Sequence, residues 1–153
     1  MKKVLAFVLI GCMLAMCSAE MAYPEDAVFE AAKQSVSLLA EGKFDGAAAL
    51  LKLPLSVAEL KAYVDSNLPQ IYTADVQTDI SVAWLSGGIW YIAVPIEIPN
   101  DSTVPAVVYT LTGTAGFAGI EVAVWRDAEQ RSRQGECVKW NVEYTPGMKF
   151  FVD

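Results

Sequence analysis

The spacing of apolar residues changes along this chain, from a helical period in the first half to a period of two in the second. Up to about residue 68, apolar side chains recur every three or four positions, which is typical of helices with one buried face. From Ile71 onward the period changes to two, and Ile80, Val82 and Trp84 alternate with polar or small residues, as in a β-strand. Helices followed by strands are the order of an α+β fold. The sequence therefore predicts N-terminal helices packed on a curved antiparallel sheet of five to six strands.

Two helices are expected before residue 52. The first begins near Pro24, because proline is favoured at the first helical position, and it ends at Gly42, a common C-terminal stop. Its apolar stripe consists of Phe29, Ala32, Val36 and Leu39. Asp45 can cap a short second helix through residues 47–51.

The third helix has the clearest start signal in the chain. Ser56 and Glu59 have the spacing of a capping box, and Leu55 and Leu60 occupy the two positions of a hydrophobic staple. Pro69 disfavours helical geometry at the residue before it, so the helix is expected to end there.

The second half is expected to form strands joined by turns. Gly87-Gly88 fits a two-residue hairpin turn, because glycine tolerates positive φ at both positions. Strands are expected over residues 80–84, 90–98, 104–112, 117–126 and 138–144. The charged stretch 126–133 is expected to be a loop or a single helical turn.

The N-terminus has the three parts of a secretory signal peptide. Lys2 and Lys3 precede an apolar run over residues 4–16, and the small residues Cys17 to Ala19 follow it. We therefore expect cleavage after Ala19, which leaves residues 20–153 as one exported domain in the periplasm or outside the cell. The apolar run is shorter than the roughly 20 residues that a membrane span needs, so no transmembrane span is expected after processing.

Lipid anchoring is the alternative for this segment. Leu14-Ala15-Met16-Cys17 resembles the lipobox of bacterial lipoproteins, although that family places a small residue where Met16 stands. A lipid on Cys17 would tether the domain to a membrane without spanning it.

The charge balance argues against polyanionic partners. The chain has 11 basic and 18 acidic residues. Loss of Lys2 and Lys3 with the signal peptide leaves 9 against 18, a net charge of −9. Nucleic acids and anionic membrane surfaces bind to basic surfaces, so we expect neither as a partner.

The residue types exclude several kinds of catalytic and metal site. The chain contains no histidine, and after processing Cys137 is its remaining cysteine. Ser/His and Cys/His nucleophilic systems are therefore excluded, and Cys137 is expected to be a packed strand residue. Carboxylate pairs such as Asp127 and Glu129 are typical of solvated loops, so we expect no metal and no cofactor.

The segment Leu38-Leu39-Ala40-Glu41-Gly42-Lys43-Phe44-Asp45-Gly46-Ala47-Ala48 is similar to the helix–Gly–aromatic–Asp–helix junction of secreted NTF2-like domains. The resemblance implies a cone-shaped fold whose sheet and helices enclose a pocket. That family usually has a strand or short hairpin before its last helix, and none is visible here. The smaller cystatin-like arrangement, one helix and a curved sheet, therefore stays open, although its protease-inhibitor loop motif is absent.

The same resemblance implies an enzymatic alternative. NTF2-like isomerases use an acidic base and a tyrosine donor in an apolar pocket. The groups available for an isomerase or dehydratase are Tyr63, Tyr109, Asp75, Asp79 and Glu97. No spacing pairs a tyrosine with an acid, and the acids alternate outward from the apolar faces.

Aromatic residues are the candidate ligand-binding residues. Trp84, Trp90 and Trp140 fall on the expected inward faces, with Tyr144 beside them and Tyr63 facing from the third helix. They fit either a pocket for a small apolar ligand or an ordinary core.

Three functions follow from these observations. The leading hypothesis is an exported, non-enzymatic domain that binds a small apolar ligand or an envelope protein partner. The second is the isomerase- or dehydratase-like enzyme. The third is a protein-interaction or inhibitor module, which an exposed apolar patch around Tyr91 and Trp125 would favour.

Overall fold

The computed structural model describes residues 22–75 and 80–141. The expected signal peptide and Tyr144 lie outside these residues. The helices of the described part are α2 (Asp26–Ala40), α3 (Phe44–Leu51), α4 (Val57–Asn67), the short 3-10 helix η1 (Pro69–Thr73) and α5 (Trp125–Arg133). Within the described ranges, no helix is both long and apolar enough to cross a membrane.

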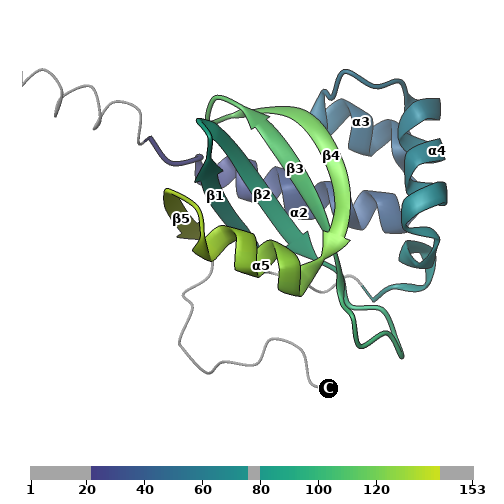
Figure 1. Cartoon of the computed structure of the whole chain (residues 1–153). Coiled ribbons are helices and arrows are strands. Elements are labelled where there is room, and N and C mark those ends of the chain that lie inside the picture. The colour runs from purple at the N-terminus through teal and green to yellow at the C-terminus, as the bar shows by residue number, and fades with distance from the viewer. Residues whose placement is uncertain (1–21, 76–79, 142–153) are drawn as a thin grey trace, which may run out of the picture.

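Five strands form one antiparallel sheet (Figure 1). They are β1 (Val82–Ser86), β2 (Ile89–Pro95), β3 (Pro105–Thr112), β4 (Gly116–Val124) and β5 (Cys137–Trp140). The strand order is β4-β3-β2-β1-β5, so β4 and β5 lie at the two edges of the sheet. The predicted α+β class, with helices before a curved antiparallel sheet, is confirmed.

Local signals position the helix ends. After α2, the N–H of Gly42 donates to the carbonyl of Leu39, and the N–H of Lys43 donates to that of Leu38. This is the Schellman motif that a glycine in the left-handed conformation allows, and Gly42 has φ +73°. The expected cap at Asp45 is wrong, because α3 begins one residue earlier and Asp45 lies inside its first turn.

The capping box before α4 is confirmed. The Ser56 side chain accepts from the N–H of Glu59 at 3.2 Å, and a Glu59 carboxylate oxygen accepts from the N–H of Ser56 at 2.7 Å. The hydrogen bond from the backbone N–H of Ser56, together with the interaction of the Ser56 side chain with the carboxylate, lowers the pKa of Glu59. The helix ends at Asn67, before Pro69, as predicted.

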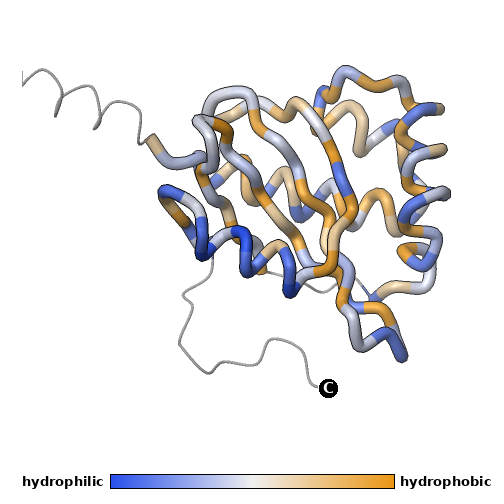
Figure 2. The backbone as a smooth tube through the Cα atoms, viewed as in Figure 1, coloured by the Kyte–Doolittle hydropathy of each residue, from blue (hydrophilic) through white to orange (hydrophobic). Residues whose placement is uncertain are grey.

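The charged stretch after β4 forms a nine-residue helix instead of the expected loop or single helical turn. Trp125, Ala128 and Ser132 are buried on one side of the nine-residue α5, three to four positions apart. Figure 2 shows that most of this helix is hydrophilic. The narrow apolar stripe is sufficient because the sheet supplies the rest of the packing surface.

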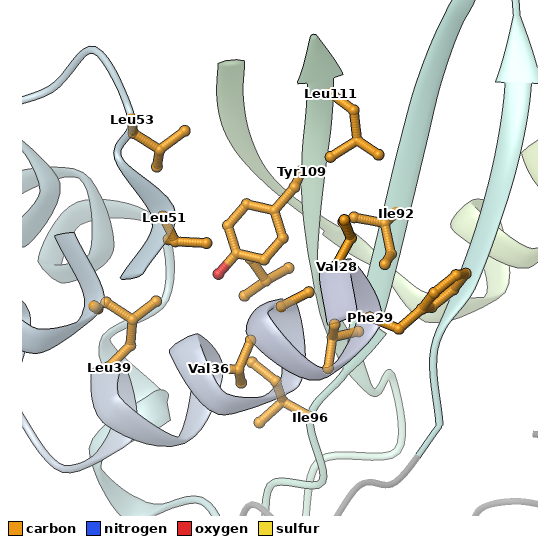
Figure 3. Close-up of a cluster of buried hydrophobic side chains, with 14 of the residues drawn as sticks. Val28, Phe29, Val36, Leu39, Leu51, Leu53, Ile92, Ile96, Tyr109 and Leu111 are labelled. Atoms are coloured by element: carbon orange, nitrogen blue, oxygen red, sulfur yellow. The ribbon is translucent and has the colours of Figure 1, made fainter. Parts of the chain in front are cut away.

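Both faces of the sheet are therefore covered. The N-terminal helices pack on one face, where the larger core contains Phe29, Leu39 and Ile92 (Figure 3). Helix α5 packs on the opposite face, where Trp84, Val108 and Trp125 belong to a second cluster. Because the central strands β1, β2 and β3 bury residues on both sides, alternation along a strand separates two cores here.

Candidate functional site

The aromatic residues predicted to share one site lie in different places. The Gly87-Gly88 turn pairs Leu85 with Trp90, and Trp84 with Tyr91. Cross-strand partners share a face of the sheet, so Trp84 and Trp90 lie on opposite faces. The prediction of a common inward face for the tryptophans is therefore wrong. The two-residue turn fixes this register, and it was the signal in the sequence that could have separated them.

Trp84 belongs to the attachment of α5. Its ring stacks on that of Tyr91 with centroids 5.4 Å apart, and the Arg131 guanidinium lies 5.2 Å from the Trp84 centroid and 5.4 Å from that of Tyr91. Arg131 also pairs with Glu121 of β4 at 2.5 Å. These contacts join α5 to three strands, and they leave Trp84 buried beneath the helix.

The other predicted residues also have structural neighbours. Trp140 meets Trp125 edge to face, with centroids 6.0 Å apart. Trp90 is buried in the larger core, and the centroid of its ring lies 5.6 Å from that of the exposed Tyr23 ring. The apolar patch considered around Tyr91 and Trp125 is not exposed, because Trp125 is buried and Tyr91 is half-buried.

Tyr63 lies at the edge of the sheet. Its hydroxyl oxygen accepts a hydrogen bond from the N–H of Val122 in β4 at 3.0 Å. This contact bridges α4 and the outer side of an edge strand, so Tyr63 covers a backbone group of the sheet.

The space between α2 and the sheet is filled by side chains, with Tyr109 of β3 among them (Figure 3). Its hydroxyl lies 2.5 Å from that of Ser35, which donates to the carbonyl of Ala32. Burial raises the pKa of Tyr109 far above its ordinary value of 10.0, although the hydrogen bond to Ser35 acts in the opposite direction. The hydroxyl is thus a neutral, hydrogen-bonded group of the core.

The tyrosine–carboxylate hydrogen bond in the described part of the chain is on the surface. The hydroxyl of Tyr72 donates to Asp65 at 2.5 Å, and Lys61 pairs with the same carboxylate at 2.5 Å. Partial burial and this hydrogen bond raise the pKa of Tyr72 to about 12. Asp75 and Glu97 are exposed, and Asp79 lies outside the described residues.

A groove of about 300 Å³ lies between the first half of α2, the end of α3 and the start of β4. Its lining residues are Glu25, Ala27, Val28, Ala31, Leu50, Leu51, Lys52, Ala115, Gly116 and Phe117. Small side chains from α2 and the β3–β4 turn keep the groove open, while buried apolar side chains such as Val28 and Leu51 form part of its wall. Its size is at the lower end of the range of small-molecule sites.

The groove has two charged groups at its rim. Lys52 follows α3 directly and Glu25 precedes α2, and both residues are exposed. No motif in the sequence marks this site, because its lining comes from three separate segments. In the described ranges, no group of three or more acidic or cysteine side chains is placed to hold a metal ion.

Comparisons with known proteins give no relative. No protein-family model matches the chain, and neither a curated protein nor a solved structure matches it.

Proposed function

We propose that this chain is an exported, non-enzymatic binding domain that takes up a small, mainly apolar ligand in the groove between α2, α3 and β4. The groove is the observation that carries the proposal. The N-terminal sequence supports export, with its two lysines, apolar run and small residues before position 20.

The lining favours an apolar ligand with one polar end. Ala27, Ala31 and Phe117 offer carbon surface, while Lys52 and Glu25 offer one charge of each sign at the rim. Ligand sites commonly combine mainly apolar walls with a few polar groups that fix orientation. We assign the aromatic residues beneath α5 to packing and not to ligand binding.

The enzymatic alternative has less support. An acid–base site needs a tyrosine and a carboxylate within hydrogen-bond distance in a cavity. The Tyr72–Asp65 pair is on the surface, and the buried Tyr109 hydroxyl is bonded to a serine.

The experiment is a titration of protein starting at residue 20 with a fluorescent apolar dye. Ala27→Trp fills the groove from an exposed position in the first turn of α2. Ala58→Trp is the matched control, because Ala58 is an exposed alanine at the same position in the first turn of α4. We expect A27W to weaken dye binding at least about tenfold and A58W to leave it unchanged.

Equal dye binding by A27W and the wild type would overturn the groove as the site. An envelope protein retained by the wild type but not by A27W would favour the partner alternative, in which an apolar side chain of that protein fills the groove. The intact mass of the exported protein separates cleavage after Ala19 from lipidation at Cys17.

A further inference from the structure

The outer side of β4 carries backbone groups that no strand among the described residues pairs with. In the β3–β4 ladder, Ile120, Val122 and Val124 lie opposite Tyr109, Val107 and Pro105. The N–H of Val122 donates to Tyr63, away from β3. Backbone direction alternates along a strand, so Ile120 also directs its N–H and C=O groups outward. Val124 directs its N–H outward, whereas its C=O accepts the first hydrogen bond of α5 as the N-cap of that helix. Figure 1 shows β4 at the margin of the sheet.

This edge has few of the usual protections against pairing with another strand. Edge strands of soluble proteins are commonly protected by lysine, proline or short length. β4 has nine residues, without lysine or proline. Its one charged residue, Glu121, is neutralised by Arg131 of the same chain. The Tyr63 hydroxyl of α4 covers the N–H of Val122, and the C=O of Val124 belongs to the start of α5. Among the described residues, the other outward groups of Ile120, Val122 and Val124 have no hydrogen-bond partner.

The strand is complementary to itself. Antiparallel pairing about a twofold axis at Val122 places Ile120 opposite Val124 of a second copy, and Val122 opposite Val122. Side chains of these β-branched residues then meet on one face, where Val124 is 37% exposed. On the other face, Glu121 lies opposite Ala123 of the second copy, so the two acidic groups do not face each other. A twofold axis is the commonest symmetry of soluble homo-oligomers.

We propose that β4 is a dimerisation edge that pairs antiparallel with β4 of a second copy, and that the Tyr63 hydroxyl opposes this pairing by occupying the Val122 N–H. Pairing about Val122 needs the N–H that Tyr63 now occupies. The Tyr63 hydroxyl must therefore leave Val122 in both copies before the two sheets join. Dimerisation therefore breaks two Tyr63–Val122 hydrogen bonds, one in each copy, and this cost lowers the affinity of the two copies for each other.

The test compares monomer–dimer equilibria by sedimentation from about 1 µM to about 500 µM. Tyr63→Phe frees the Val122 N–H, and we expect it to strengthen dimerisation at least about tenfold over the wild type. Tyr72→Phe is the matched control, because it removes an exposed hydroxyl that bonds to Asp65 rather than to β4. It should leave the equilibrium unchanged.

Val122→Pro in the Y63F background is the second variant. Proline removes an outward N–H without removing a donor from the β3 ladder, which edge strands tolerate. We expect this variant to be monomeric, while Val122→Ala in the same background still dimerises. Amide exchange at Val122 and Val124 of Y63F should slow as concentration rises, which tests the interface even if V122P does not fold.

Two results would overturn the proposal. One is a Y63F protein that stays as monomeric as the wild type over the whole range. The other is a Y63F dimer in which exchange at Val122 does not depend on concentration, because its interface would then lie elsewhere.

Discussion

Two residues at helix ends adopt the same left-handed backbone conformation with different side chains. Gly42 follows α2 with φ +73°, and Lys52 follows α3 with φ +49°. A β-carbon in this conformation costs roughly 1 kcal/mol, which glycine avoids. A β-carbon at Gly42 would meet no atom within 4 Å, so backbone conformation alone sets the cost of a substitution there.

The two positions give opposite predictions. Gly42→Ala should lower the free energy of unfolding by about 1 kcal/mol, while Lys52→Gly should raise it by about 0.5 kcal/mol. In both directions the greater freedom of glycine in the unfolded chain offsets part of the conformational cost, so neither effect should exceed about 1 kcal/mol. Urea unfolding of both variants measures the pair. A Gly42→Ala protein as stable as the wild type would contradict the conformational argument.

At the scale of an element, the side chain of Arg131 joins helix α5 to the sheet. Arg131 contacts the rings of Trp84 and Tyr91 and pairs with Glu121. Arg131→Met keeps much of the side-chain stem but removes the charge, so we expect a loss of about 1 kcal/mol in unfolding free energy. Its ion pair is half-exposed and adds little of that loss.

Arg133→Met is the control for this prediction. Arg133 belongs to the same last turn of α5 and pairs with Glu129 of the same helix. Such pairs are worth about 0.3–0.5 kcal/mol, so Arg133→Met should lower the free energy of unfolding by less than Arg131→Met does. Chemical unfolding followed by tryptophan fluorescence measures both variants, and equal losses would show that the ring contacts add nothing.

Elements with their own local signals could be predicted from the sequence. Ser56, Glu59 and Pro69 mark the ends of α4 because a helix end depends on residues within one turn of it. Helix α5 could not be predicted in this way. Its first residue follows β4 directly, and it has no side-chain cap. Its stability comes from packing on a face of the sheet whose position depends on the whole fold.

At the scale of the molecule, the α+β class was predictable, but the use of the two sheet faces was not. Alternation shows which residues of one strand share a face, whereas the pairing register decides which residues of neighbouring strands share that face. The prediction for Trp84 and Trp90 failed at this step. The groove was not predictable either, because its lining joins residues that lie far apart in the chain, such as Ala27 and Phe117.

The core as a whole should weaken at alkaline pH because it holds a neutral tyrosine hydroxyl. Tyr109 is fully buried, and its pKa in the folded protein lies above the ordinary value of 10.0. Above pH 10 the unfolded chain releases this proton while the folded protein keeps it. The folded state then binds more protons, so stability falls as the pH rises, by about 1.4 kcal/mol per pH unit for this one group. Below pH 10 its contribution is fully present.

Tyr109→Phe tests this dependence. At neutral pH the variant should lose about 1 kcal/mol, because Ser35 loses its hydrogen-bond partner in the core. Between about pH 10 and about pH 11.5, its unfolding free energy should fall less steeply than that of the wild type, by the one proton that Tyr109 no longer binds. Tyr23→Phe removes an exposed hydroxyl and should keep the steeper wild-type slope. Denaturant unfolding at these pH values gives both slopes. If Y109F and the wild type had equal slopes, the folded core would not be holding the Tyr109 hydroxyl neutral.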